Sequence, residues 1–182
     1  MSGLSVLGHL LRPVRAGDGH SLWNRPGFQG PELFTLTSPA FADGTAIPAE
    51  HAGKGAGPNI APALSWNPAP AATAQLLLVI EDIDVPFPRP LIHTAAVFEP
   101  RLSGVAKGEL GTAGAYVKAS LGATGYAGPR PIPGHGPHRY GFYLFALDQE
   151  RRIAPGQPLR DWRSGAGRVL ARGRLVGTYE LP

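Results

Sequence analysis

Glycine and proline restrict the fold of this chain more than any other feature. The sequence has 25 Gly and 20 Pro among 182 residues, roughly twice the usual share of each. Proline in a helix interior costs about 3 kcal/mol, which argues against a mainly helical fold. Hydrophobic residues still make up 43% of the chain, in short runs between the Gly and Pro clusters, which argues against disorder. The pattern therefore predicts short strands joined by many tight turns.

Apolar runs mark the expected strands. The run 140–147 is apolar on both faces, and the run 75–80 is continuous enough for a strand buried on both faces. Strands do not alternate regularly with helices, so we predict an all-β fold, an antiparallel two-sheet β-sandwich. The other expected strands are 33–37, 63–66, 92–98 and 176–181.

Helices are expected only near the two ends of the chain. Leucines recur at helical spacing over 4–11, and 162–175 is the second candidate helix. The length suits one domain. We divide the chain into an N-terminal leader, 1–30, and a β-sandwich domain, 31–182.

Composition excludes several classes of function. The chain has no cysteine, which excludes disulfides, thiolate metal sites and a cysteine nucleophile. No apolar run reaches the ~18 residues of a membrane span, and the basic residues of the leader follow its apolar stretch, unlike a secretory signal. We therefore expect a cytoplasmic protein. The net charge is +4, but the Arg-rich stretch 151–174 has a single aromatic residue, so basic and aromatic residues do not alternate along it, and we expect a solvated helix face and no specific nucleic-acid site.

A carboxylate stands at the end of the first long apolar run. Strand periodicity puts Asp82 on the same face as Leu78 and Ile80. If that face is the core, Asp82 needs a buried donor as its partner. If the strand instead stops at Ile80, Asp82 begins a solvated turn. The pattern favours neither alternative.

Histidines follow in two further segments. His93 is a lone imidazole in an apolar strand, which by itself is a weak signal. Three Pro and two Gly in 128–134 make a stiff loop that leads to His138 at the start of an apolar strand. Such a loop can present backbone N–H groups and imidazoles to an anion. The alternative is a rigid connector with His135 and His138 exposed to solvent.

Together these segments resemble the phosphatidylethanolamine-binding protein family, also called Raf-kinase-inhibitor-like proteins. The family pattern has D-P-D-x-P, a strand with a central His, and Y-x-G-P-x-P-P-x-G-x-x-H-R-Y, in this order. The corresponding residues are 82–86 (Asp-Ile-Asp-Val-Pro), His93 and 126–140. Segments 57–66 and 175–179 also resemble the bacterial branch of the family.

The resemblance implies a Greek-key β-sandwich with a small anion-binding pocket at one end. Asp82, His93 and His138 would line this pocket. Its wall would be shaped by Pro86, Tyr126, Gly128, Pro131 and Tyr140. The family also suggests a cis peptide at Val85–Pro86, which only an X-Pro bond tolerates easily.

The resemblance further implies a non-enzymatic module that binds phosphate or a phosphorylated head group. Family members are also described as inhibitors of kinases or proteases, so a protein partner is conceivable, as is a homodimer. No cofactor and no metal are expected. Since imidazole donors titrate near 6.5, we predict that anion affinity rises as the pH falls from about 8 to 6.

The sequence departs from the family pattern at four positions. Ile83 and Ile132 each replace a proline, and Thr94 replaces an aromatic residue. Arg130 stands where a small residue is usual; it would strengthen anion binding only if it faces the pocket.

The alternative function is a metal-dependent hydrolase. Asp82, His93 and His138, with His135 as a further candidate, could ligate a metal, although their spacing matches no standard zinc motif. The sequence has no G-x-S-x-G, no phosphate-binding P-loop and no dinucleotide fingerprint. We therefore favour a binding module.

Overall fold

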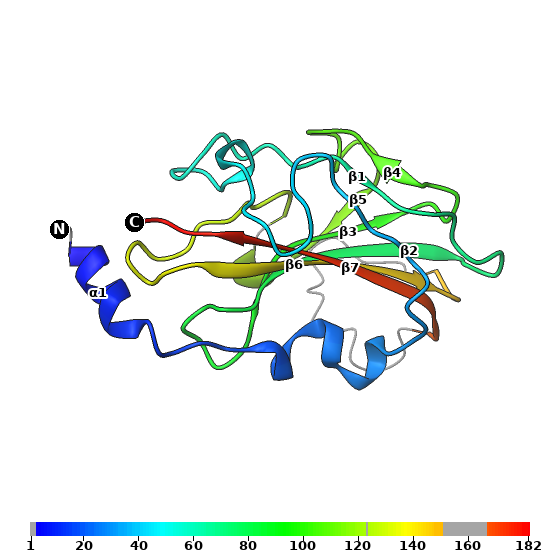
Figure 1. Ribbon diagram of the computed structural model, residues 1–182. Coiled ribbons are helices and arrows are strands. Elements are labelled where there is room, and N and C mark those ends of the chain that lie inside the picture. Colours follow the sequence, from blue (N-terminus) through cyan, green and yellow to red (C-terminus); the bar gives the residue numbers. More distant parts are fainter. Residues whose placement is uncertain (1–2, 123, 151–166) are drawn as a thin grey trace.

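The computed structural model describes residues 3–122, 124–150 and 167–182. Its centre is a five-stranded antiparallel sheet with the order β5-β3-β2-β6-β7, and two short strands, β1 and β4, pair in a separate sheet (Figure 1). The strands are β1 (Leu64–Ser65), β2 (Gln75–Asp82), β3 (Leu91–Phe98), β4 (Gly104–Val105), β5 (Ala115–Val117), β6 (His138–Leu147) and β7 (Val169–Tyr179). The helical elements are α1 (Gly3–Leu11) and the 3-10 turns η1 (Asp18–His20), η2 (Leu22–Asn24), η3 (Pro26–Phe28), η4 (Ala49–His51) and η5 (Ser120–Gly122).

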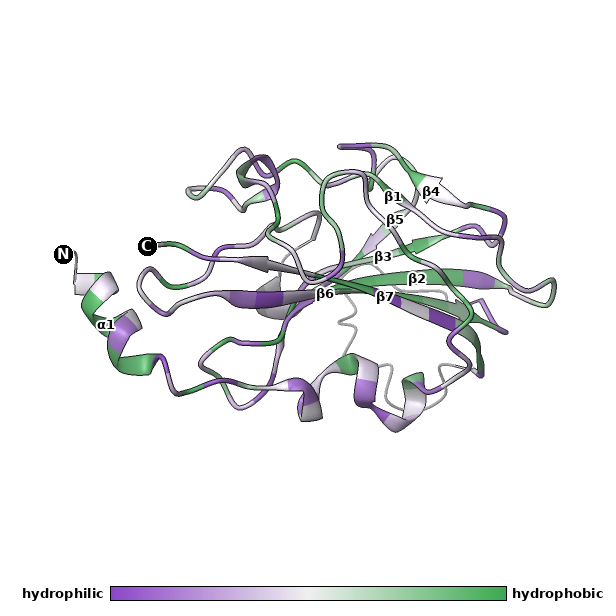
Figure 2. Ribbon diagram, in the orientation of Figure 1, coloured by the Kyte–Doolittle hydropathy of each residue, from purple (hydrophilic) through white to green (hydrophobic). Residues whose placement is uncertain are grey.

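The two most apolar runs form the middle of the large sheet, as the sequence predicts. Every residue of β2 is buried, and β2 lies between β3 and β6, so both edges of its backbone are hydrogen-bonded. β6 is almost as completely buried. Figure 2 shows β2 in green, the hydrophobic end of the scale, over much of its length. Each buried leucine, valine or phenylalanine contributes about 1.5–3 kcal/mol, which explains why these strands occupy the centre.

Alternate side chains of β2 enter two separate cores. Leu76, Leu78 and Ile80 pack with Phe142 under the loops around β1 and β4. Their odd-numbered neighbours pack on the opposite face of the sheet, where the leader covers them. The residues that the leader brings to this second core are Leu22, Trp23 and Phe28.

The expected sandwich is therefore confirmed only in its coarser form, as an antiparallel β-fold. The face of the large sheet opposite the leader is covered by loops and by the two-residue strands β1 and β4, so a full second sheet is not established. The strand expected at 33–37 is reduced to isolated bridges at Glu32 and Thr37. Gly and Pro in these loops limit ladder formation, because proline cannot donate to a ladder.

The C-terminal helix expected at 162–175 is wrong where the structure describes it. Residues 162–166 lie outside the described part, and the strand β7 begins at Val169 and pairs with β6 along its whole length. Gly173 pairs with Leu144 in this ladder. Position 173 is also close to the loop before β1, because a Cβ atom there would lie 2.5 Å from the carbonyl oxygen of Phe34. The long hydrogen-bonded ladder with β6 outweighs the local helix propensity of this segment.

The expected leader helix is confirmed as α1. It does not cover the sheet; it lies at one end of the molecule, near the loop before β6 (Figure 1). Its leucines Leu4, Leu7 and Leu10 are 62%, 45% and 72% exposed. Across the described residues, the search for membrane spans identified no helix with the length and hydrophobicity that crossing a bilayer requires.

Candidate functional site

The strand β2 carries Asp82 into a buried position. It continues past Ile80, so the interpretation of Asp82 as the start of a solvated turn is wrong. A register shift against β3 between Ile80 and Glu81 brings Asp82 opposite Leu91, while on the other side it pairs with Tyr140 of β6. The side chain is 2% exposed.

Asp82 has the buried donor that its position requires. His138 Nδ1 lies 2.9 Å from Asp82 Oδ2 and 3.1 Å from Oδ1, and the backbone N–H of Asp84 donates to Oδ1 over 3.0 Å. His138 is 1% exposed. A buried carboxylate is tolerable in this setting because an imidazole and a backbone donor both contact it.

His93 stands on the other side of Asp82. Its Nε2 lies 4.0 Å from Asp82 Oδ2, and its Nδ1 lies 3.2 Å from the carbonyl oxygen of Ala127, to which it donates. Burial lowers the pKa of His93, although the negative charge of Asp82 acts in the opposite direction. The ring is therefore neutral at neutral pH, with its proton on Nδ1.

The loop before β6 is held by contacts with the segment around His51. Asn59 Oδ1 accepts the N–H of Gly128 over 2.9 Å, and the hydroxyl of Tyr126 donates to the carbonyl of His51 over 2.8 Å. A Cβ atom at position 128 would overlap that same carbonyl, so glycine is required there. These contacts hold the loop against the body of the protein.

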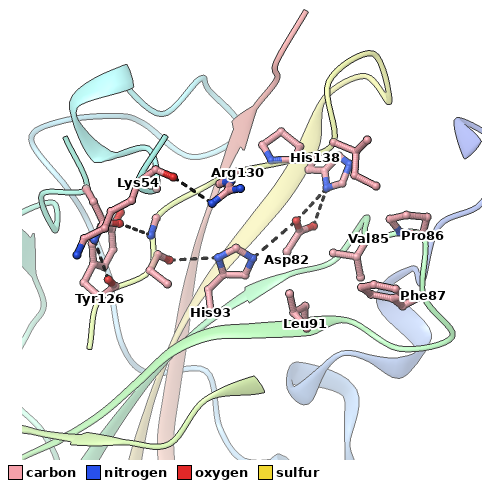
Figure 3. Close-up of a pocket in the computed structure, with 16 residues that line it drawn as sticks. Lys54, Asp82, Val85, Pro86, Phe87, Leu91, His93, Tyr126, Arg130 and His138 are labelled. Atoms are coloured by element: carbon pink, nitrogen blue, oxygen red, sulfur yellow. Dashed lines mark hydrogen bonds and ion pairs between the residues drawn. The ribbon is translucent and has the colours of Figure 1, made fainter. Parts of the chain in front are cut away.

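A cavity of about 470 Å³ opens between this loop and the ends of β2 and β3 (Figure 3). Asp82, His93 and His138 form its polar end, and Lys54 and Arg130 contribute two exposed cations. The apolar part of the lining consists of Val85, Pro86, Phe87, Leu91, Pro131 and Ile132. The cavity is suited to a ligand with one charged end and one apolar end.

Most residues expected from the sequence meet at this cavity. Its lining includes Asp82, His93, His138, Pro86, Tyr126, Gly128 and Pro131. Tyr140 is not part of the lining; its ring centroid lies 5.4 Å from that of His93, in an edge-on arrangement, and 6.4 Å from that of His138, with which it stacks. Tyr140 supports the two imidazoles and does not form the wall.

The position of Arg130 and the peptide bond at Val85–Pro86 were two further expectations. Arg130 borders the cavity, and its Nη1 donates to the carbonyl of Lys54 over 3.1 Å. The expected cis peptide at Val85–Pro86 is wrong, because no cis bond occurs among the described residues. Even before proline the trans form is favoured by about 0.5–1 kcal/mol.

His135 has a larger part in the site than the sequence pattern indicated. The alternative that leaves His135 and His138 exposed is wrong, since they are 0% and 1% exposed. His135 Nδ1 lies 2.6 Å from His138 Nε2, and His135 Nε2 lies 2.8 Å from the carbonyl oxygen of Leu11. The signal in the sequence was the spacing His-x-x-His, which leaves open whether the rings meet each other or a ligand.

Asp84 and Arg139 were not recognised as a pair. Asp84 is 3% exposed, and Arg139 donates to it through its backbone N–H, Nε and Nη2 over 2.8–2.9 Å. Burial alone would raise the pKa of Asp84, but the hydrogen bonds and charge of Arg139 outweigh burial and lower it. This ion pair fixes the turn that follows Asp82.

Comparison with known proteins supports the same segment as the body of the fold. The model of the phosphatidylethanolamine-binding protein family matches residues 37–180. The UPF0098 protein Mb1945c of Mycobacterium bovis is 36% identical over 171 residues, which are 93% of this chain and 80% of that protein.

Solved structures give the same result. CT736 of Chlamydia trachomatis is 32% identical, with a TM-score of 0.67 over 82% of this chain and 98% of that chain. YbcL of E. coli, described as a new member of the mammalian PEBP family, has a TM-score of 0.73 over 82% of this chain and 99% of that chain. Its identity is 23%, so this second likeness bears on the fold alone.

Proposed function

The chain belongs to the phosphatidylethanolamine-binding protein family, and on that premise we propose that its cavity binds a small anion, either phosphate or a phosphorylated head group. One observation supports this more than any other: Asp82, His93 and His138 come from three strands and meet in one cavity beside two exposed cations. A phosphate ester has several strong acceptor oxygens and needs donors or cations around it.

The donors come from side chains of different kinds. Lys54 and Arg130 supply fixed positive charge at the lining. His93 uses Nδ1 for Ala127 and keeps Nε2 beyond hydrogen-bond distance of Asp82, at 4.0 Å, so a proton on Nε2 would add a donor. The negative charge of Asp82 is met by His138, which lowers its repulsion of an anion.

Titration calorimetry with inorganic phosphate tests this function. Because burial lowers the pKa of His93, Nε2 takes its proton only below the usual His range near 6.5, so phosphate affinity should rise mainly as the pH falls below about 6. H93A should remove most of this rise. The matched control is H20A, which removes an exposed histidine outside the cavity and should keep the rise. Absence of binding by the unmodified protein at every pH would contradict the proposed function.

We also propose that the cavity binds without catalysis. Both ring nitrogens of His138 are engaged within the protein, by Asp82 and His135, so this ring has no nitrogen free to act as a base on a ligand. Elemental analysis of protein purified without chelators provides a test. Stoichiometric zinc that is lost together with Asp82, His93 or His138 would favour the metal-dependent hydrolase instead.

The wider biological roles stay predictions from the family resemblance. Inhibition of a kinase or protease, a protein partner, a homodimer and a cytoplasmic location each need a direct measurement. Family membership alone does not fix them, because one fold supports several functions.

A further inference from the structure

A continuous row of hydrogen bonds leads from the N-terminal helix into the cavity. The carbonyl oxygen of Leu11 lies 2.8 Å from His135 Nε2, and His135 Nδ1 lies 2.6 Å from His138 Nε2. The row ends where His138 Nδ1 lies 2.9 Å from Asp82 Oδ2. We call these three side chains, Asp82, His138 and His135, the relay.

Counting protons along this row fixes the charge of the relay. Each of the three contacts needs one proton, since two lone pairs or two N–H groups facing each other at these distances would repel. A carbonyl oxygen can only accept, so His135 must carry a proton on Nε2. Two neutral imidazoles have two protons in total, which leaves one contact without a proton. The relay therefore needs a third proton.

The third proton belongs on the imidazole pair. Imidazole is a stronger base than carboxylate, and Asp82 also accepts the N–H of Asp84, which favours the ionised carboxylate. The pair then carries one positive charge, which balances the negative charge of Asp82.

We propose that His135 is a positioning residue of the anion site, and that docking of α1 makes the relay hold its third proton and keeps the polar end of the cavity free of net negative charge. The consequence for anion binding rests on the proposed function. The proton count concerns the protein without a ligand and does not depend on that function.

The docking of α1 is a close-packed contact. A Cβ atom on Gly8 would overlap the carbonyl oxygen of Pro133, and one on Gly134 would lie 2.5 Å from Nδ1 of His9. Arg12 Nε donates to the carbonyl of Gly134 over 2.8 Å. Leu11 is the last residue of the helix, where carbonyl groups lack intrahelical partners, so its oxygen is available to His135.

Undocking the helix would change the proton count. Without Leu11 as an acceptor, His135 could keep its proton on Nδ1 and donate to His138, which would donate in turn to Asp82. Two protons would then suffice, and the relay would carry one negative charge at neutral pH. The contact with α1 is thus what requires the third proton.

Other charges around the relay bear on its titration. Arg15 is a neighbouring cation, with Nη2 donating to the carbonyl of His135 over 3.1 Å and Nη1 3.7 Å from Asp84 Oδ2. Burial of the ring, with the charges of His138 and Arg15, lowers the pKa of His135, whereas the hydrogen bond to the carbonyl of Leu11 acts in the opposite direction. The further titratable groups that face the relay are His9 and Arg12 from the leader, Asp84 from the turn after β2, His93 from β3 and Tyr140 from β6.

Nitrogen-15 NMR of the imidazole rings in the full chain tests the proton count directly. At pH 7.5 we expect three N–H protons on the four nitrogens of His135 and His138. Two would overturn the proposal. In H135N the amide can turn to donate to His138, so His138 should carry a single proton, on Nδ1, at this pH.

A pair of glycine substitutions in one helix separates docking from helix propensity. G8A introduces a methyl group that overlaps the body, whereas G3A places one where nothing lies within 4 Å. We expect two N–H protons on the pair in G8A and three in G3A. Three protons in both variants, with α1 shown by NMR to be undocked in G8A, would also overturn the proposal.

Phosphate titration separates this proposal from the proposed function. A net negative charge a few ångströms from the ligand should weaken phosphate binding by about tenfold, so H135N and G8A should bind more weakly than the unmodified protein at pH 8. If the unmodified protein binds no phosphate, the proposed function fails, while the NMR count still decides the relay. If phosphate binds with equal affinity to all variants at pH 8, the positioning role of His135 is refuted.

Discussion

Glu81 gives the sharpest prediction about stability. It lies on β2 with 0% exposure, on the face covered by the leader, and its Oε2 accepts the N–H of Leu22 over 2.8 Å. Its Oε1 has no hydrogen-bond partner. Burial raises the pKa of Glu81 from 4.5 to about 7, against the lowering effects of the Leu22 hydrogen bond and the charge of Arg25.

The sign of the effect follows from linkage. The folded protein prefers the protonated carboxyl more strongly than the unfolded chain does, so ionisation of Glu81 removes stability as the pH rises from 4.5 towards 7. At about 1.4 kcal/mol for each pH unit, the loss is about 3 kcal/mol once the pH exceeds 7. Below 4.5 this group costs the fold nothing.

E81Q removes the ionisation and keeps an oxygen that can accept from Leu22. We expect its free energy of unfolding to exceed that of the unmodified protein by about 2 kcal/mol more at pH 8 than at pH 5. Urea denaturation at both pH values measures the difference. The matched control is E180Q, which makes the same chemical change at an exposed position.

If E81Q changes the free energy of unfolding equally at pH 5 and pH 8, ionisation of Glu81 does not destabilise the fold, and the reasoning is refuted. Any constant effect would then come from packing or from the amide itself.

Three further predictions follow from other parts of the fold. R139M should lower the free energy of unfolding by about 2 kcal/mol at pH 7, because it leaves Asp84 buried without its partner, and the double variant with D84N should recover part of the loss in urea denaturation. The loss should shrink as the pH falls through the lowered pKa of Asp84, since that carboxyl contributes stability only while ionised. G173A should lower the melting temperature far more than G27A, because the added methyl group would lie 2.5 Å from Phe34 atoms, whereas nothing lies within 4 Å of position 27. Light scattering should return twice 19.1 kDa if the expected homodimer forms, and a mass of 19.1 kDa would contradict it.

The local pattern of the sequence identified the centre of the sheet. The residues of β2 and β6 are apolar on both faces, and burial on both faces is the environment in which such runs are stable. The motifs 82–86 and 126–140 likewise identified the loops that border the cavity. These features depend on residues close together in the chain, so a linear pattern reports them.

Prediction from the local pattern failed where contact with a distant segment decides the conformation of a stretch. The stretch that begins at Val169 has enough alanine, leucine and arginine to suggest a helix, yet pairing with β6 makes it a strand. Pairing with β6 satisfies the backbone N–H and C=O groups of this stretch through a long-range contact, which local propensity does not report.

The amino-acid sequence by itself determined which residues are buried in the central strands and which residue types stand at the ends of those strands. Only the tertiary structure decided that His135 reaches His138, that Leu11 caps this pair, and that Asp82 is buried beside them. Leu11 and His135 are 124 residues apart, and Asp82 and His138 are 56 apart. Hydrogen bonds of this kind depend on where whole elements dock, and the packing of the leader and the loops onto the sheet sets that position, because no short stretch of sequence contains both partners.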